Sequence, residues 1–380
     1  MNVVVAIDSF KGSLSTFQAG EAVSQGIKKV YPKACVRVCP IADGGEGTTA
    51  AMVTAMGGVM NQISVTGPLG EKVTASYGIV ENGRTAVIEM AEAAGLPLIK
   101  KEERNPLYTT TYGVGEMIAD AIKKGCRKFI VGIGGSATND GGIGMLQALG
   151  FQFLDKNGEQ VCMGANGLKN VESIKIDKCL KELAECDFRV ACDVKNPLCG
   201  EWGCSYVFAR QKGATEEMIA QMDEWMKRYA HLTQQVIETA DATAEGTGAA
   251  GGLGFALLSY LNAKMYSGIE LVIRETGLEE YVKNADVVIT GEGRLDRQSV
   301  MGKAPIGVAQ VAKRYGKLVI AFSGCVEKEA TVCNEKGIDA FFPIVKKPCT
   351  LEEAMYTESA FENLSATAEQ VFRLINTLKR

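Results

Sequence analysis

The hydrophobic positions at the start of the chain form short continuous runs followed by runs with helical spacing. Residues 3–7 form a continuous apolar run, which predicts a buried strand. Apolar residues from Ala19 to Val30 recur at helical spacing, and Ser15 with Gln18 predicts a capping box at the helix start. A second strand is predicted at 36–39, with a helix beginning near Thr48. This alternation of strands and helices favours an α/β fold.

The pattern changes in the middle of the chain and then returns. Residues 61–89 form short alternating runs punctuated by Gly and Asn, which predict a small antiparallel region. Later segments again alternate between strand and helix periodicity. The predicted strands are 129–133, 188–191, 287–290, 318–322 and 341–345, and the predicted helices are 111–124, 143–149, 216–240, 306–315 and 361–378.

Length and charge narrow the class of protein. A chain of 380 residues exceeds the size at which one hydrophobic core usually stops growing, about 250–300 residues, so we expect two domains. The formal net charge of -4 argues against nucleic acid or an anionic membrane as a partner. The start of the sequence lacks a charged leader with a cleavage site, and no apolar run reaches about 18 residues. We therefore expect a soluble, cytoplasmic protein. The sequence leaves the oligomeric state open, a homo-oligomer included.

Cysteine and histidine usage limits the available chemistry. The twelve cysteines include no C-x-x-C pair, and reduced thiols are expected in a cytoplasmic protein. The chain has one histidine, His231, within a helical stretch. A histidine-based triad or metal site is therefore hard to build, and acid–base chemistry is left to Asp, Glu or Lys.

One loop stands out between the strand at 129–133 and the apolar segment at 143–149. Eight of its nine residues are glycine, hydroxyl, amide or carboxylate residues, more than a simple turn requires. Such a loop exposes backbone N–H groups to an anion, and its single carboxylate can hold a cation or a proton. The eight residues are Gly134, Gly135, Ser136, Thr138, Asn139, Asp140, Gly141 and Gly142.

Charged residues also follow the other predicted strands. Open α/β sheets bind ligands at the carboxyl ends of their strands, so these positions are candidates for a site. Carboxylates mixed with Lys, Arg and glycine amides suit Mg²⁺ and phosphate, and they predict a magnesium-dependent enzyme acting on a small anionic substrate. The candidates are Asp8, Lys11, Asp43, Glu46, Asp193, Glu292, Arg294, Asp296 and Lys303.

Two glycine- or lysine-containing segments allow more than one interpretation. Residues 210–213 (RQKG) fit either a phosphate contact or a surface turn. Residues 246–252 match G-x-G-x-x-G, but a helix rather than a strand precedes them, so the dinucleotide-binding pattern is weak there. Close approach of these glycines to a ligand or to another backbone remains open.

Parts of the sequence also fit two other classes of protein. Residues 132–137 fit G-x-G-x-x-A after a strand, and Asp155 lies 18 residues beyond Ala137, as in an NAD-type oxidoreductase. Against this, the glycines of residues 139–142 would destabilise the first turns of the following helix. A non-catalytic sensor of a small acid is the other alternative, but binding alone would favour Lys and Arg over repeated carboxylates.

A series of ordered motifs then sharpens the prediction. PIADGGEGT, AVIEMA, RNPL, GIGGSATNDGG, CDVKNPL, QKGAT, GAAGG, ITGEGRLDRQS and GKAPIGVA occur in sequence order. Together they resemble the bacterial type-1 glycerate kinase family, from about residue 1 to 345. The resemblance implies ATP- and Mg²⁺-dependent phosphorylation of glycerate, with D-glycerate as the predicted substrate and 2-phosphoglycerate as the predicted product.

The resemblance also implies a domain organisation. It predicts two α/β domains around a cleft, one with a Rossmann- or flavodoxin-like parallel sheet and the other of mixed α+β structure. The first would consist of residues 1–68 and 285–380, and the second of residues 69–284.

Carried over motif by motif, the resemblance implies roles for the candidates. Asp8 or Asp193 would be the general base, and Lys11, in the same catalytic set, would neutralise phosphate or the glycerate carboxylate. Asp43, Asp140 and Asp296 would hold Mg²⁺, and Glu46 and Glu292 would contact glycerate. Gly134, Gly135 and Ser136 would bind the nucleotide phosphates together with Arg294 and Lys303. Lys195 departs from the family pattern, because an acidic residue is common after Asp-Val.

Overall fold

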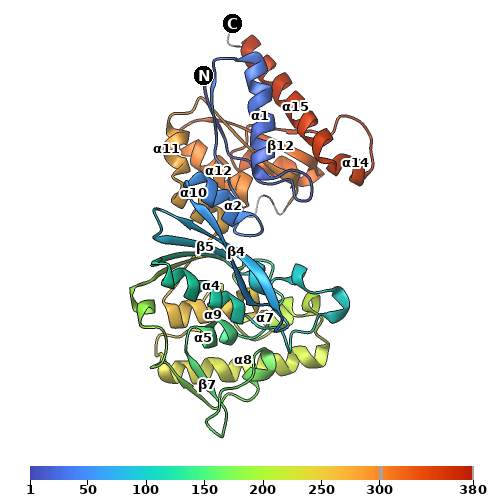
Figure 1. Cartoon of the computed structure of the whole chain (residues 1–380). Coiled ribbons are helices and arrows are strands. Elements are labelled where there is room, and N and C mark those ends of the chain that lie inside the picture. Colours follow the sequence, from blue (N-terminus) through green and yellow to red (C-terminus); the bar gives the residue numbers. More distant parts are fainter. Residues whose placement is uncertain (298, 300–302, 379–380) are drawn as a thin grey trace. The chain divides into compact units, whose positions relative to one another are not determined.

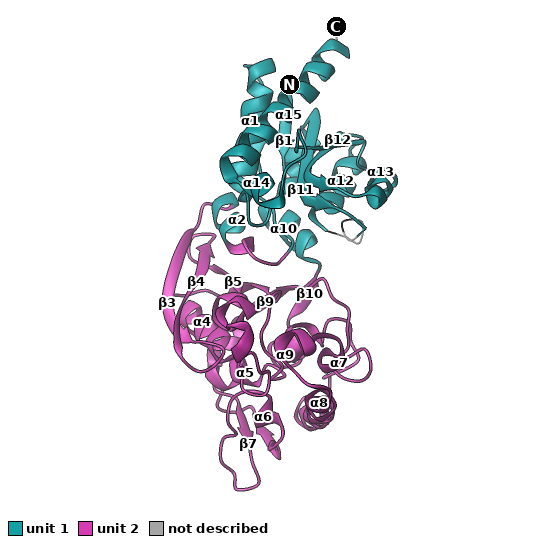
Figure 2. Cartoon of the chain, turned by 90° about the vertical axis from the view of Figure 1, so that its right-hand side faces the viewer, with its two compact units in different colours: residues 1–43, 50–55, 267–380 teal, residues 44–49, 56–266 magenta. Residues whose placement is uncertain are grey.

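The chain divides into two compact units. The computed structural model describes residues 1–297, 299 and 303–378. Unit 1 comprises residues 1–43, 50–55 and 267–380, and unit 2 comprises residues 44–49 and 56–266 (Figure 2). Unit 1 therefore contains both ends of the chain. The predicted boundaries were 68/69 and 284/285, whereas the units exchange chain between residues 43 and 56 and at 266/267.

Unit 1 is built on a five-stranded, fully parallel sheet. Its strand order is β13 (Ala340–Pro343), β12 (Leu318–Val326), β11 (Val287–Leu295), β1 (Asn2–Val5) and β2 (Cys35–Val38). From β1 the chain continues to β2 on one side, while from β11 it continues to β12 on the other. The strand order therefore reverses between β1 and β11, which is where open α/β sheets place their ligands.

Helices pack on both faces of this sheet. α1 (Thr16–Val30) and α15 (Thr357–Leu378) share a core with Val3, Val5 and Ile7, alternate residues that point to one face. α12 (Ala304–Arg314) packs on β11 and β12 and lies across the sheet from α1 and α15 (Figure 2). Among the described residues, unit 1 also contains α10 (Gly268–Thr276), α11 (Leu278–Lys283), α13 (Val332–Glu335), α14 (Leu351–Met355) and the 3₁₀ turn Lys328–Thr331.

The sequence located the first helix of unit 1 correctly. Ser15 accepts a hydrogen bond from the backbone N–H of Gln18, and the Gln18 side chain accepts one from the Ser15 N–H. This is the predicted capping box. It fixes the start of α1, and therefore the length of the loop that carries Asp8 and Lys11.

Unit 2 contains a six-stranded mixed sheet. The order is β10 (Lys264–Tyr266), β9 (Asp187–Ala191), β6 (Lys128–Gly132), β5 (Thr85–Glu89), β4 (Lys72–Val80) and β3 (Val59–Thr66). β3, β4 and β5 are antiparallel, as predicted, while β5, β6, β9 and β10 are parallel. β5 therefore joins the antiparallel segment to the parallel strands. The fold is α/β with one parallel and one mixed sheet, which confirms the predicted fold class.

Helices and a small second sheet complete unit 2 (Figure 1). α4 (Tyr112–Lys123), α5 (Ile143–Ala148), α8 (Glu216–Val236) and α9 (Ala249–Leu261) contribute to one hydrophobic core with the six-stranded sheet. The shorter elements are α3 (Ala91–Ala94), α6 (Ala165–Leu168), α7 (Cys204–Phe208), the two-stranded sheet of β7 (Gln152–Leu154) and β8 (Ser173–Lys175), and the 3₁₀ turns Leu96–Leu98, Lys101–Glu103, Lys181–Glu185 and Arg210–Lys212. α2 (Thr48–Ala55) is shared between the two units.

One strand end differs from the prediction in a way that concerns the site. The sequence placed the end of β11 at Thr290, but the strand continues to Leu295 and pairs with β12 up to Val326. Glu292 and Arg294 are therefore strand residues rather than loop residues. Because they are two positions apart, their side chains leave the same face of the strand.

No helix in the described part of the chain is both long enough and apolar enough to cross a bilayer.

Candidate active site

In unit 1, acidic and basic side chains gather at the carboxyl edge of the parallel sheet. Asp8 follows β1, and its N–H donates to the carbonyl of Gly291 in β11 (2.9 Å). Asp43 follows β2, and the Lys11 ammonium lies 3.6 Å from its carboxylate. The reversal of strand order between β1 and β11 thus brings Asp8 and the end of β11 together.

The Asp8 carboxyl group is the most perturbed acid of unit 1. Only 5% of the residue is exposed, and this burial, together with the negative charge of Asp43, raises its pKa from 3.8 to about 7. The hydrogen bond that its Oδ1 accepts from the Ser9 N–H (2.6 Å) and the charge of Lys11 act in the opposite direction. A carboxyl group in this range can exchange a proton near neutral pH.

Glu292 adds a second buried carboxyl group to this edge. Burial raises its pKa, the Asp296 and Asp43 charges add to the shift, and the charge of Lys303 opposes it. Its Oε1 is buried and has no hydrogen-bond partner among the described residues. Lys303 is the residue that caps the start of α12. Gly302, in the same motif, lies outside the described residues.

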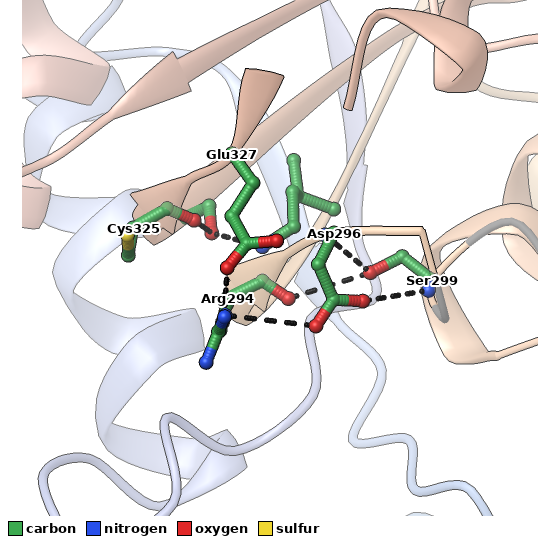
Figure 3. A network of polar contacts seen from close by, with 7 residues as sticks. Arg294, Asp296, Ser299, Cys325 and Glu327 are labelled. Carbon is green, nitrogen blue, oxygen red and sulfur yellow. Dashed lines mark hydrogen bonds and ion pairs between the residues drawn. The ribbon is translucent and has the colours of Figure 1, made fainter. Parts of the chain in front are cut away.

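Arg294 is held between two carboxylates at the end of β11. Its guanidinium forms ion pairs with Glu327 and with Asp296, the latter at 3.6 Å, and its side chain remains 61% exposed (Figure 3). Asp296 and Ser299 exchange two backbone-to-side-chain hydrogen bonds, which fix the turn after the strand. The guanidinium is thus positioned while part of it remains accessible.

The structure brings seven of the predicted residues to one edge of the unit 1 sheet. No group of three or more His, Cys, Asp or Glu side chains among the described residues has the geometry of a complete metal site. The seven residues are Asp8, Lys11, Asp43, Glu292, Arg294, Asp296 and Lys303.

The glycine loop of unit 2 follows β6. Gly134 and Gly135 are exposed and Ser136 is half-buried, with Gly135 at φ 74°. The backbone N–H groups of these three residues donate no hydrogen bond within the described chain, whereas the Gly135 carbonyl accepts from the Leu96 N–H and the Ala137 N–H donates to the Ala94 carbonyl. The loop is therefore anchored by its neighbours and leaves three consecutive donors for a ligand.

Asp140 lies at the inner end of the same loop and is fully buried. Its Oδ2 accepts hydrogen bonds from the Thr111 N–H (2.8 Å), the Thr111 hydroxyl (2.8 Å) and the Gly144 N–H (3.3 Å), and its Oδ1 accepts from the Gly142 N–H (3.1 Å). Burial nevertheless raises its pKa. Four donors from the starts of α4 and α5 surround this carboxylate, so it ties the loop to both helices.

A glycine pair at the start of α9 fits against this loop. A Cβ at Gly251 would lie 2.0 Å from the Thr138 carbonyl, and a Cβ at Gly252 would lie 2.7 Å from the Gly141 Cα. The Gly141 N–H donates to the Gly251 carbonyl at 2.9 Å. The glycines of residues 246–252 therefore serve backbone-to-backbone packing, one of the interpretations that the sequence left open.

Two further sites in unit 2 carry predicted residues. Glu46 is exposed on the loop of residues 44–49. This loop packs closely against β6, as a Cβ added to Gly132 would lie only 2.7 Å from the Gly44 carbonyl oxygen. Asp193 is exposed just after β9. Glu46, Asp193 and the glycine loop all follow or adjoin the carboxyl ends of strands in the unit 2 sheet.

Comparison with known proteins decides the family. The sequence profile of the glycerate kinase family matches residues 3–376. The chain belongs to the glycerate kinase family. It is 46% identical over 375 residues to a glycerate kinase of Haemophilus influenzae, covering 99% of each chain, and 45% identical over 371 residues to the glycerate 2-kinase of Escherichia coli K12, covering 98% of this chain and 97% of the relative.

A solved structure agrees with this assignment. The crystal structure of a protein described as a glycerate kinase 2 from Salmonella typhimurium LT2 matches with a TM-score of 0.92 and 45% identity, covering 100% of this chain and 99% of that one. The resemblance inferred from the motifs is thereby confirmed. As a member of the glycerate kinase family, the protein is an enzyme of the phosphotransferase class.

The two alternatives from other classes are wrong. In an NAD-binding fold, the acidic residue ends the strand next to the glycine loop. Asp155 instead follows β7, whose partner strand is β8 in the separate two-stranded sheet, and the neighbours of β6 are β5 and β9. Membership of the glycerate kinase family also excludes the non-catalytic sensor.

In this glycerate kinase family member, sequence reasoning overlooked Glu89 and left the environment of Lys212 open, and both side chains are buried in unit 2. Glu89, buried at the end of β5, accepts hydrogen bonds from the N–H groups of Thr49 (2.7 Å) and Gly47 (3.3 Å) and so holds the loop that bears Glu46. A carboxylate inside the apolar run TAVIEM was the available signal. Lys212, in the RQKG segment, is 2% exposed, so the surface-turn interpretation is wrong for this side chain.

Proposed function

We propose that the protein transfers the γ-phosphoryl group of ATP to glycerate, with D-glycerate as substrate and 2-phosphoglycerate as product. The family membership and the relatives named glycerate kinase and glycerate 2-kinase support this activity and this product. Within this chain, the proposal rests on the Asp8 carboxyl group. It is buried at the carboxyl edge of the parallel sheet and titrates near neutrality.

Asp8 is the proposed general base. A base that takes a hydroxyl proton works best with a pKa near the operating pH, and the pKa of Asp8 is about 7. Asp193, the other candidate, is exposed at the end of β9, and no comparable burial supports it. In this assignment the glycerate hydroxyl donates its proton to an Asp8 oxygen while the glycerate oxygen attacks the γ-phosphorus. The bond between that phosphorus and the β,γ-bridging oxygen breaks, and ADP leaves.

The acidic edge of unit 1 suits a magnesium ion. Asp8, Asp43, Glu292 and Asp296 are close enough for their charges to raise the pKa values of Asp8 and Glu292, and the buried Oε1 of Glu292 lacks a partner among the described residues. Mg²⁺ usually takes one or two carboxylates together with water and substrate phosphates, so a partial set of protein ligands fits it. When bound, Mg²⁺ neutralises charge on the phosphates.

Asp43 and Asp296 are the proposed magnesium carboxylates. Each has a side chain that is 19% exposed and can reach a ligand. Asp140 was predicted for the same role, but its two oxygens already accept four hydrogen bonds inside unit 2. We therefore propose a structural role for Asp140, in fixing the glycine loop.

The cationic and amide groups are proposed to bind the anionic parts of the ligands. Lys11, Arg294 and Lys303 would neutralise phosphate or the glycerate carboxylate, as exposed or half-buried cations at the strand ends. The free N–H groups of Gly134, Gly135 and Ser136 would bind nucleotide phosphates. Glu46 and Glu292 are proposed to accept hydrogen bonds from glycerate hydroxyl groups. We also propose a cytoplasmic location, which the twelve unpaired cysteines support.

The decisive experiment measures ADP release from MgATP with D-glycerate, using L-glycerate, glycerol and no acceptor as controls. We expect turnover with D-glycerate, and NMR of the product places the phosphate on the 2- or the 3-position. An absence of turnover with every acceptor, in a protein shown to be folded, would contradict the proposed function.

The base assignment has its own test. Asp8→Asn and Asp193→Asn are compared for kcat with saturating MgATP and D-glycerate. We expect the large loss in Asp8→Asn. Near-normal kcat in Asp8→Asn together with a large loss in Asp193→Asn would transfer the role to Asp193.

A further inference from the structure

Lys212 is an unusual lysine because its ammonium group is inside the protein. It ends the 3₁₀ turn Arg210–Lys212 of unit 2, the residue is 2% exposed, and Gly213 follows at φ 95°. Its neighbour Arg210 behaves in the ordinary way: its side chain is 57% exposed and forms an ion pair with Glu216. The two basic residues of this turn therefore occupy opposite environments, which makes Arg210 a matched control.

The Lys212 ammonium is directed at the glycine loop. Its Nζ donates a hydrogen bond to the Thr138 carbonyl (2.6 Å) and another to the Ser136 hydroxyl oxygen (2.9 Å). No carboxylate of the described residues lies within ion-pair distance of this group; the nearby ionisable groups are Cys204 and Asp140. Burial accordingly lowers the pKa of Lys212 to about 8. A buried cation without a paired anion is costly, so its retention calls for a reason.

The chemistry of the ammonium group determines which way the Ser136 hydroxyl can act. An ammonium can only donate hydrogen bonds, so the Ser136 oxygen accepts from Lys212. The Ser136 proton is then available to donate, and none of the described residues accepts it. Ser136 is half-buried beside the exposed Gly134 and Gly135, whose N–H groups are also without acceptors in the described chain. The Ser136 hydroxyl and the three backbone N–H groups of residues 134–136 are therefore four donors available to a ligand on this loop.

We propose that Lys212 is a positioning residue that fixes the Ser136 hydroxyl as a donor to an anionic oxygen of the ligand bound on the loop of residues 134–136. The inference rests on the proposed function and deepens it, because the anionic oxygen belongs to a nucleotide phosphate or to the glycerate carboxylate. Lys212 supplies positive charge behind the loop, and the bound anion is the partner that the buried cation lacks.

The test is a set of variants assayed for KM with ATP and with D-glycerate separately. Lys212→Met keeps the length of the side chain and removes both the charge and the donors. We expect it to raise one KM at least tenfold, and the ligand affected identifies the source of the anion. Arg210→Met should leave both KM values within twofold of the wild type. Both KM values within twofold in Lys212→Met would overturn the proposal.

Coupling to Ser136 separates positioning from a general structural role. Ser136→Ala should raise the same KM, and the double variant Lys212→Met/Ser136→Ala should be little worse than Lys212→Met alone, because Lys212 acts through Ser136. Ser136→Thr, which keeps the hydroxyl, should restore most of the affinity. A double variant whose defect equals the product of the two single defects would contradict the proposal.

Folding and activity are controlled independently. Circular dichroism and thermal melting establish whether each variant is folded. If Lys212→Met does not fold, Lys212→Gln, whose side chain is a neutral donor, takes its place. We expect Lys212→Gln to raise KM by less than Lys212→Met would. Calorimetric titration with MgADP and with D-glycerate measures binding without turnover. If the wild type binds either ligand but shows no turnover, the proposed function fails while the Lys212 comparison stands. If the wild type binds neither, the inference fails as well.

Discussion

The two units place functional groups at the carboxyl ends of parallel strands by opposite physical means. In unit 1 the groups are mostly side-chain charges: Asp8, Glu292 and the Arg294 ion pairs crowd the edge next to β1 and β11. In unit 2 they are mostly backbone N–H groups, presented by a loop that buried side chains hold from behind. In the proposed function, the crowded charges of unit 1 act directly on a ligand, whereas the peptide loop of unit 2 needs supporting side chains that do not themselves reach the ligand.

The same difference predicts how substitutions divide between activity and stability. In unit 1, repulsion between neighbouring carboxylates lowers the free energy of unfolding, and a bound cation would reduce this repulsion. In unit 2, in contrast, the buried Asp140 and Lys212 form hydrogen bonds that hold the loop in place. Substitutions in unit 1 should therefore reduce activity without loss of stability, and substitutions of the supports in unit 2 should reduce both.

The largest expected effect is that of Asp8→Asn. Removing the general base should lower kcat by about 10²–10⁴-fold. The pKa of Asp8 is about 7 in the folded protein, and its ordinary value is 3.8. Between pH 3.8 and about 7, the carboxyl group is therefore protonated in the native state and ionised in the unfolded state. This contribution to stability is lost as the pH rises from about 4 to 7. Above pH 7 the native wild type must hold a buried, ionised carboxylate, which lowers its free energy of unfolding. Asp8→Asn carries no such charge and should therefore raise the free energy of unfolding by up to about 4 kcal/mol at pH 8.

Urea denaturation at pH 5 and pH 8 checks the stability part of this prediction. The advantage of Asp8→Asn should be smaller at pH 5, where the native wild-type carboxyl is already protonated. Asp177→Asn, at an exposed position, is the control and should change neither kcat nor stability. An Asp8→Asn protein that is less stable than the wild type at pH 8 would break the contrast between the two units.

The next effect concerns the magnesium requirement. Asp43→Asn and Asp296→Asn should each raise the Mg²⁺ concentration needed for half-maximal activity by about tenfold or more, with little change in thermal stability. Titration of activity with Mg²⁺ at saturating nucleotide measures this. Glu245→Gln removes an exposed carboxylate that pairs with Lys195 and serves as the control. An unchanged requirement in both aspartate variants would remove them from the metal site.

Asp140→Asn tests the same distinction from the other side. An amide cannot accept all four hydrogen bonds that Asp140 receives, so the free energy of unfolding should fall by about 2 kcal/mol. The Mg²⁺ requirement should stay that of the wild type. A large shift in this requirement would restore Asp140 as a metal ligand and would make unit 2 resemble unit 1 in its chemistry.

The smallest effect is expected from Gly135→Ala. Its φ of 74° costs an L-residue about 1 kcal/mol, although a Cβ would find ordinary contact 3.6 Å from the Ala91 Cβ. Gly125→Ala imposes the same kind of strain at φ 97° in open space after α4. We expect similar losses in melting temperature for both, and a KM increase of roughly three- to tenfold only for Gly135→Ala. Equal KM values in the two variants would argue against ligand binding by the loop.

The sequence predicted much of this architecture because strand ends carry strong local signals. Apolar runs that break into glycine and carboxylate located the ends of β1, β2, β6 and β9 to within a few residues. It failed at β11, where the polar Glu292 and Arg294 suggested a loop. Pairing with β12 extends that strand to Leu295, and pairing across a sheet is not visible in the periodicity of one segment.

The sequence also could not predict which polar residues are buried. RQKG is polar and contains glycine, so its local pattern is the same for a surface turn and for a turn that directs Lys212 inward. Asp140 likewise resembles a metal ligand in sequence, and only the donors from Thr111, Gly142 and Gly144 show that its oxygens are engaged within the protein. The contacts of Lys212 with Ser136 and Thr138, and those of Asp140 with Thr111, join residues distant in sequence.

The order of β2, β1 and β11 also has a consequence for synthesis. β1 pairs with β2 on one side and with β11 on the other, and the whole of unit 2 is translated between β2 and β11. Ribosomes add about 5–20 residues per second, so the edge of β1 that pairs with β11 stays unpaired for roughly ten seconds or longer before β11 is synthesised. During that interval a nascent chain exposes an apolar strand edge, so chaperone capture and edge-to-edge aggregation are expected to act on the first forty residues.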